Sequence, residues 1–278
     1  MKTMGLMWQD GSGESESFTS NYFQAEKQMS TQEPTFSEVV KNRYSARAFL
    51  PSPIPSDILK DILLEAQCAP SNCNTQPWTL HIVAGDKLRE LSHALTEDLR
   101  AGNYSLDFTF DKEAYPEPFR QRASEQGRSY YQALGVARGD SLSRSEVVER
   151  NVRFFGAPHV ALLFIPAVGD NVRVASDAGM YAQTFLLSLA ARGYAGVPQA
   201  VLSYFAQTVR RLLNVPEGFR LLYGISFGIP DKTHPSLSYR EGRVSLNGQC
   251  HQGAGCCKQR NYPAHRPWCA ITEQGKKK

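Results

Sequence analysis

Two arginines and a serine stand at alternate positions in the stretch RYSARAF, residues 43–49. Arg43 and Arg47 flank Ser45 just after an expected helix end, where an extended chain would present all three side chains on one face. Guanidinium groups are charged, forked donors and a serine hydroxyl adds another, which suits a phosphate or other oxyanion. Taken alone, the pattern is more typical of a solvated surface, so both interpretations stay open here.

A second polar stretch, APSNCNTQPW at residues 69–78, joins an expected helix to an expected strand. It places Ser71, Asn72 and Asn74 ahead of Trp78. Pro77 and Trp78 favour turn and core positions. The intervening glutamine, at position 76, fits a ligand contact and a turn equally well.

Four motifs in order resemble the FMN-dependent nitroreductase family: the two stretches above, then GVPQA at residues 196–200 and YREGR at residues 239–243. The resemblance extends from about Phe36 to Leu246. The segments RNVRFFGAPHVALLF and DAGMYAQTFLLSLAARG are most similar to the nitrobenzoate-reductase-like branch. Any one motif is weak evidence, whereas four in the right order identify the family.

The resemblance implies a homodimeric α+β fold with a central mixed sheet covered by helices. FMN would lie at the subunit interface, and both chains would contribute to each site. Pro70 and the polar residues after it would reach the flavin bound mainly by the partner, and backbone N–H groups of 197–200 would meet flavin N5 and O4. The FMN-binding residues implied in this way are Arg43, Tyr44, Ser45, Arg47, Pro70, Ser71, Asn72, Asn74, Gln76, Pro198, Gln199, Ala200, Arg240 and Arg243.

Within that set, the resemblance places Arg43, Ser45 and the late Arg243 on the phosphate side, with Arg240 assisting. Arg47 would lie near flavin O2 and N1 or the ribityl chain, where a fixed cation stabilises the negative charge of the reduced ring. Gln199 stands where some relatives carry a glutamate, which leaves its side-chain role open.

The implied activity is ping-pong reduction of nitroaromatic or similar electron-poor compounds, with NADPH or NADH as the electron donor. The flavin carries the chemistry, so no catalytic side chain and no metal ligand is expected. Alternatives are another reaction on the same scaffold (reductive dehalogenation, enone or quinone reduction) and a non-catalytic flavin-binding or redox-sensing protein. Acceptor choice is assigned to aromatic residues of segment 108–131, namely Phe108, Phe110, Tyr115, Phe119, Tyr130 and Tyr131.

The elements that must position these residues follow from periodicity. A capping box, Thr35 with Glu38, predicts a helix over 36–42. The nearly continuous apolar run HVALLFI at 159–165 predicts a central strand covered on both faces. The remaining expected helices are 55–69, 86–100, two within 117–155, 175–192 and 204–213, and the remaining strands are 78–84, 194–200 and 219–227.

Composition predicts a flexible arm over 1–34, an FMN-binding domain over 35–249 and a basic, cysteine-containing tail over 250–278 that is disordered. The tail holds four of the six cysteines, and a zinc cluster there is the alternative, although paired CxxC spacing is missing. The tail holds six Lys or Arg against one acid, which accounts for the positive net charge of the whole chain, +4, so a nucleic-acid-binding body is not supported. With no long apolar run and no signal-like amino terminus, a cytoplasmic protein is expected.

Overall fold

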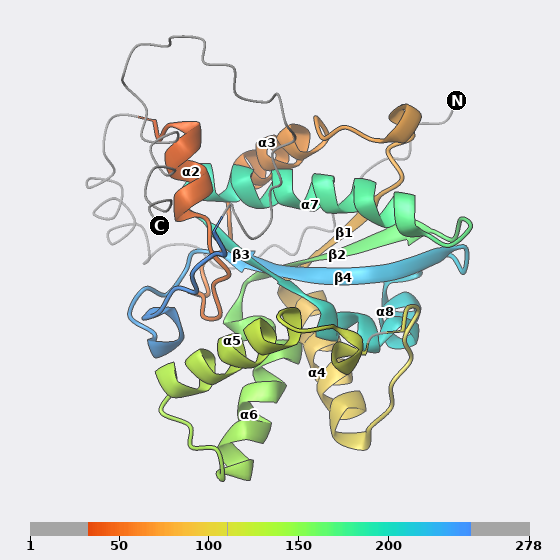
Figure 1. The fold of residues 1–278 in the computed structure, drawn as a ribbon. Coiled ribbons are helices and arrows are strands. Elements are labelled where there is room, and N and C mark those ends of the chain that lie inside the picture. Colours follow the sequence, from red (N-terminus) through yellow and green to blue (C-terminus); the bar gives the residue numbers. More distant parts are fainter. Residues whose placement is uncertain (1–32, 110, 246–278) are drawn as a thin grey trace, which may run out of the picture. The chain divides into compact units, whose positions relative to one another are not determined.

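The structure is a computed structural model that describes residues 33–109 and 111–245 (Figure 1). The chain divides into two compact units, residues 1–240 and 241–278, and all the helices and strands below belong to the first. Most of the expected amino-terminal arm and all of the expected tail, with its cysteines, lie outside the described residues. Those boundaries therefore stay predictions.

Four strands form one sheet in the order β1-β2-β4-β3, and every neighbouring pair is antiparallel. The α+β fold class is confirmed. The expected mixed character is confined to isolated bridges of parallel sense, such as Ser45 with Gly196, since the four strands themselves contain no parallel pair. The strands are β1 (Thr79–Ala84), β2 (His159–Pro166), β3 (Ala195–Gln199) and β4 (Phe219–Gly228).

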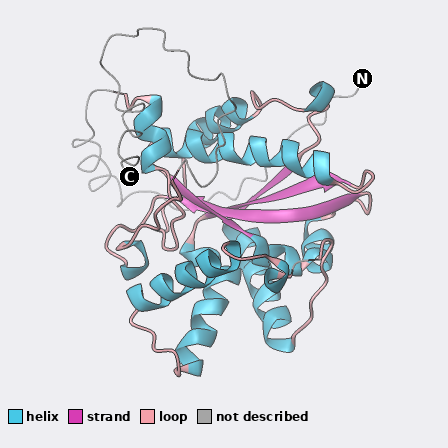
Figure 2. Ribbon diagram, viewed as in Figure 1, coloured by secondary structure: helices cyan, strands magenta, loops and turns pink. Residues whose placement is uncertain are grey.

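Helices cover both faces of the sheet, as Figure 2 shows. On one face lie α2 (Phe36–Asn42), α3 (Ser56–Ala66) and α7 (Val172–Ala191). On the other lie α4 (Gly85–Ala101), α5 (Phe119–Ala133), α6 (Ser141–Val152) and α8 (Ala206–Leu213). Short 3-10 turns lie between or after these elements, including η2 (Asn72–Asn74), η5 (Ala200–Tyr204) and η6 (Pro235–Leu237).

The strand β2 organises the core because consecutive side chains of a strand point to opposite faces. Its even-numbered residues from Val160 to Phe164 pack in one apolar cluster with α4 and α8. Its odd-numbered residues from Ala161 to Ile165 pack in a second cluster with α3 and α7. The prediction of a central strand covered on both faces is confirmed.

Local signals also match the helix ends. The Thr35 hydroxyl oxygen accepts the Glu38 N–H at 3.3 Å, and the Glu38 carboxylate accepts the Thr35 N–H at 2.8 Å, which completes the predicted capping box. In α7, Ala178 and Ala182 are buried in the cluster that α3 shares. These two alanines therefore serve packing within the chain.

His159 predicts how stability depends on pH. Its Nε2 accepts the Ile54 N–H at 2.9 Å, its ring stacks on Phe227, and burial lowers its pKa from 6.5 to about 4. An unfolded chain takes up this proton near pH 6.5 and the folded chain only near pH 4. The free energy of unfolding should therefore fall between about pH 6.5 and 4, by up to about 3 kcal/mol from this group.

Urea denaturation at several pH values measures this effect. His159→Gln keeps an acceptor for the Ile54 N–H but does not titrate, so the difference between wild type and variant isolates the histidine. The two proteins should differ most at neutral pH and converge toward pH 4. A difference that stays constant with pH would contradict the assignment.

Candidate functional site

The stretch RYSARAF is extended, as its spacing indicated. The helix α2 ends at Arg43, which has extended dihedral angles, and Ser45 then forms a bridge of parallel sense with Gly196 of β3. Ala46 is buried, while Arg43, Ser45 and Arg47 are all half-buried. The alternation places these three on the more open side of the segment, beside β3.

Gly196, the β3 residue of that bridge, permits close packing of β3 against α7. A Cβ atom on Gly196 would lie 2.8 Å from Leu186 Cδ2 and 3.3 Å from Ile225 Cγ2, so a side chain at this position would displace the apolar layer between α7 and β4. The glycine of the GVPQA motif therefore has a packing role next to the candidate site.

Arg47 is held through its backbone, and its guanidinium forms no ion pair with a described carboxylate. Its carbonyl oxygen accepts hydrogen bonds from Arg150 Nη2 at 3.0 Å and Ser236 Oγ at 3.3 Å. Its guanidinium carbon lies 5.1 Å from the centre of the Tyr130 ring. Among the residues that the structure describes, no carboxylate pairs with it. A half-buried cation without a counter-charge favours binding of an anionic group.

Arg240 and Tyr44 lie together, but in an arrangement that supports the fold. The Arg240 guanidinium lies 3.7 Å from the centre of the Tyr44 ring and donates to the carbonyls of Leu237 and Tyr239 at 2.9 and 2.8 Å. Because these bonds occupy some of its N–H groups, fewer of them are available to a ligand. Arg243 belongs to the separate unit that begins at Glu241 and donates to two carbonyls of that unit, so its role stays a prediction.

The stretch APSNCNTQPW forms an exposed turn that is stabilised by its own polar groups. Ser71 Oγ accepts the Gln76 N–H at 2.9 Å, and Gln76 Nε2 donates to Asn74 Oδ1 at 3.1 Å. Asn74 and Gln76 have φ angles of 55° and 47°, in the left-handed region. Both residues close the turn, and a flavin contact of Gln76 stays a prediction. Pro70 and Asn72 are exposed beside it, and the Asn72 side chain accepts only a weak thiol contact from Cys73 at 3.8 Å.

Asp177 anchors this turn, which sequence reasoning missed. It lies in the second turn of α7, is only 6% exposed, and its Oδ2 accepts the Asn72 N–H at 3.1 Å. No sequence signal joins two residues 105 positions apart, so this contact needed the fold.

Gln199 uses its side chain in the core. Its Nε2 donates to the Asn151 carbonyl at 2.9 Å, and its Oε1 accepts from the Ser226 hydroxyl. Pro198 and Ala200 on either side of it are exposed at the end of β3. The Gln199 side chain thus fixes the strand end, and the exposed residues Pro198 and Ala200 are what a ligand could meet.

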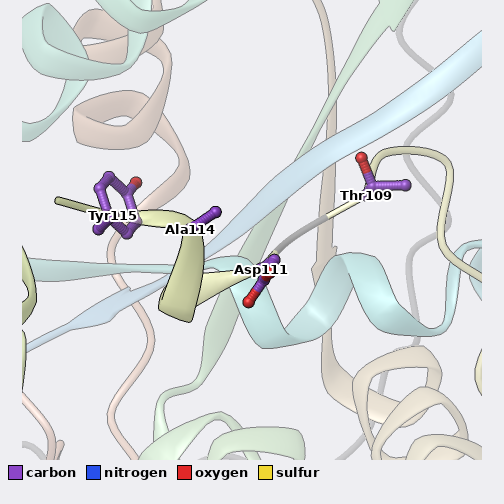
Figure 3. Close-up of a pocket in the computed structure, with 4 residues that line it drawn as sticks. All are labelled: Thr109, Asp111, Ala114 and Tyr115. Carbon is purple, nitrogen blue, oxygen red and sulfur yellow. The ribbon is translucent and has the colours of Figure 1, made fainter.

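The aromatic segment 108–131 is heterogeneous, and Phe110 lies outside the described residues. Phe108 packs against the core and Tyr130 is buried, whereas Tyr115 and Phe119 are each 49% exposed. Tyr131 carries the Arg144 guanidinium 3.9 Å above its ring. A shallow pocket of about 270 Å³, lined by Thr109, Asp111, Ala114 and Tyr115, lies just before α5 (Figure 3).

Within residues 33–109 and 111–245, no group of three or more histidine, cysteine, aspartate or glutamate side chains is arranged to hold a metal ion. None of the described helices combines the length and apolar character needed to cross a membrane.

Comparison with known proteins identifies the family. The family described as Nitroreductase family matches residues 40–229. The chain is 38% identical over 209 residues to nitroreductase NfnB of Mycolicibacterium smegmatis, covering 75% of this chain and 88% of that protein. It is 31% identical over 223 residues to a 4-nitrobenzoate reductase of Pseudomonas putida, covering 78% and 94%.

Structural similarity agrees with the sequence matches. The crystal structure of the FMN-dependent nitroreductase NfnB from Mycobacterium smegmatis in complex with NADPH superposes with a TM-score of 0.76 at 36% identity, covering 78% of this chain and 97% of that chain. The resemblance predicted from four short motifs is confirmed, and the chain belongs to the nitroreductase family.

Proposed function

We propose that this chain is an FMN-dependent oxidoreductase that uses NADPH or NADH to reduce nitroaromatic compounds. The observation that carries the proposal is the half-buried Arg47 guanidinium, which has no acid partner among the described residues and lies on the same open side as Ser45. The names of the similar proteins, an FMN-dependent nitroreductase bound to NADPH and a 4-nitrobenzoate reductase, support the same conclusion.

The donor set fits FMN. Arg43 and Ser45 offer charged and neutral donors for a phosphate, and Arg47 lies two residues further along the same side. When bound, FMN supplies hydride transfer between the nicotinamide and the acceptor. The Arg47 cation would stabilise negative charge on the reduced ring. The buried Gln199 side chain would keep the exposed end of β3 in place beside it.

The acceptor would be an electron-poor aromatic compound. The exposed rings of Tyr115 and Phe119 offer apolar faces on which a nitroarene could stack. Because NADH and NADPH are supplied in the cytoplasm, a cytoplasmic location is part of the proposal.

A homodimer with FMN at the interface completes the proposal. The three helices on one face of the sheet expose large apolar side chains: Phe36 and Val40 on α2, Leu64 on α3, and Val172 and Met180 on α7. Burial of such side chains against a second copy would remove apolar surface from water. The exposed turn at 70–76 lies next to α7 through Asp177 and would reach the partner's flavin from there.

A steady-state assay tests the activity. Oxidation of NADPH or NADH by the purified, FMN-loaded protein should accelerate on addition of 4-nitrobenzoate or nitrobenzene, with parallel double-reciprocal plots as expected for a ping-pong mechanism. Comparing the two nucleotides at equal concentration gives the donor preference. Slow flavin reduction that no acceptor accelerates would contradict the proposal and favour a flavin-binding protein without turnover.

The polar turn gives a separable prediction. Asn72→Ala should raise the FMN dissociation constant about tenfold with little change in stability, because the exposed Asn72 amide makes only the weak thiol contact described above. Asn74→Ala should also reduce the free energy of unfolding, by about 1 kcal/mol, because Asn74 adopts a left-handed conformation and bonds Gln76.

Flavin fluorescence titration and urea denaturation measure the two quantities. Thr75→Ala provides a control, since Thr75 is exposed in the same turn and is not among the residues predicted to bind FMN, so FMN affinity should stay at the wild-type value. Equal FMN affinity of wild type and Asn72→Ala would show that this amide does not bind flavin.

A further inference from the structure

Two elements distant in sequence meet at the backbone of Arg47. Arg150 from α6 and Ser236 from η6 both donate to the Arg47 carbonyl oxygen, at 3.0 and 3.3 Å. His234 connects the two donors, since its Nε2 lies 3.2 Å from Arg150 Nη2 and its Nδ1 lies 2.8 Å from Ser236 Oγ.

Both ring nitrogens of His234 lie within hydrogen-bond distance of these donors. Nδ1 accepts the Ser236 N–H at 3.1 Å, and the Ser236 hydroxyl, 2.8 Å from Nδ1, also contacts the Arg47 carbonyl. On the other side of the ring, Arg150 Nη2 lies 3.2 Å from Nε2. Burial and the neighbouring Arg150 charge lower the pKa of His234, which keeps the ring neutral at pH 7.

Arg150 makes its polar contacts with Arg47 and His234 and not with the neighbouring acid. The adjacent carboxylate, Glu149, pairs instead with Arg100 and Arg153. Among the described residues, Arg150 forms hydrogen bonds with the Arg47 carbonyl and with His234, and it is half-buried. Tyr130, whose ring lies under the Arg47 guanidinium, supports the side chain of Arg47 while Arg150 and Ser236 support its backbone.

We propose that Arg150, assisted by His234 and Ser236, is a positioning residue that fixes Arg47 for its interaction with the flavin. This inference rests on the proposed FMN function. A positioned Arg47 stabilises negative charge on the reduced ring more than it stabilises the neutral oxidised ring. Loss of the positioning contact should therefore weaken binding of reduced FMN more than binding of oxidised FMN, and lower the midpoint potential of the bound flavin.

The experiment compares Arg150→Gln, Arg150→Lys and His234→Gln with wild type and with the control Arg153→Gln. Arg153 lies at the end of the same helix, is exposed, and pairs with Glu149 without contact to Arg47. Three quantities are measured for each protein: the dissociation constant of oxidised FMN by fluorescence titration, the two-electron midpoint potential, and the urea midpoint of the flavin-free protein.

Arg150→Gln should raise the FMN dissociation constant about tenfold. It should also shift the midpoint potential in the negative direction by about 30 mV for each further tenfold loss in affinity for the reduced form. Arg150→Lys should recover part of the FMN affinity and part of the midpoint potential. His234→Gln should change both quantities in the same direction as Arg150→Gln. Arg153→Gln should match wild type in both. A purely structural role would change the urea midpoint and leave the potential of the retained flavin unchanged.

The outcomes separate the two proposals. If wild type binds no FMN, the proposed function fails and this inference fails with it. If wild type binds FMN and the Arg150 and His234 variants share its affinity and potential, the positioning role alone is overturned. Should Arg150→Gln fail to fold, Arg150→Lys and His234→Gln decide the question by the same measurements.

Discussion

Replacing Arg47 with alanine should raise the FMN dissociation constant by about ten- to a hundredfold and lower the flavin midpoint potential. The guanidinium is half-buried, and no described acid neutralises it, so its charge is available to a ligand. Loss of one charge-assisted hydrogen bond costs about 1.5–3 kcal/mol. Stability of the flavin-free protein should change little, since removing an unpaired, partly desolvated cation offsets the lost contact with the Tyr130 ring.

Fluorescence titration of the flavin-free protein measures the affinity, and urea denaturation measures the stability. Arg211→Ala is the matched control, since Arg211 is an exposed arginine in the last turn of α8. Unchanged flavin content and turnover in Arg47→Ala would remove Arg47 from the site.

The same variant tests whether each flavin site is shared between subunits. Co-expression of Arg47→Ala with Asn72→Ala produces mixed dimers. If Arg47 of one chain and Asn72 of the partner subunit serve one site, a mixed dimer contains one intact site and one doubly altered site. Flavin affinity at half the sites should then return to the wild-type value. If both residues serve the site of their own chain, every site carries one substitution and none recovers.

Much of the fold could be predicted because its signals are local. The apolar run at 159–165 had to be buried on both faces, and it occupies an inner position in the sheet. The capping box at Thr35 fixed the start of α2 to the residue. The antiparallel order β1-β2-β4-β3 was not predictable in this way, since it depends on contacts between segments far apart in the chain.

The residues of the candidate site were predicted from the sequence as one set. The structure shows that some of them face the open side of the fold and that others support the core. The alternation of Arg43, Ser45 and Arg47 follows from strand geometry and could be read directly. The use of Gln199 in the core could not, because its partners come from α6 and β4. Asp177 and Arg150 were missed for the same reason: each acts on a segment about a hundred residues away.

Trp78 belongs to the same polar stretch as the predicted flavin ligands, but its contacts stabilise the fold. It is buried just before β1, its ring lies 5.0 Å from that of Tyr181 in α7, and its Nε1–H donates to Gln67 Oε1 at 3.1 Å. Trp78→Ala should therefore lower the free energy of unfolding by about 3–5 kcal/mol. Flavin loss in this variant should follow unfolding and not precede it.

Trp78→Phe provides the control that makes this prediction sharp. A phenylalanine keeps an aromatic ring against Tyr181 but loses the hydrogen bond to Gln67, so the cost should be about 1–2 kcal/mol. Urea denaturation followed by circular dichroism gives the stability, and flavin fluorescence in the same samples gives the affinity. Wild-type stability with weakened FMN binding in Trp78→Ala would instead make Trp78 a ligand. The reverse pattern is expected here, because the predicted flavin contact is that of the exposed Asn72, six residues before Trp78. Trp78 supplies the packing that holds the turn between α3 and β1.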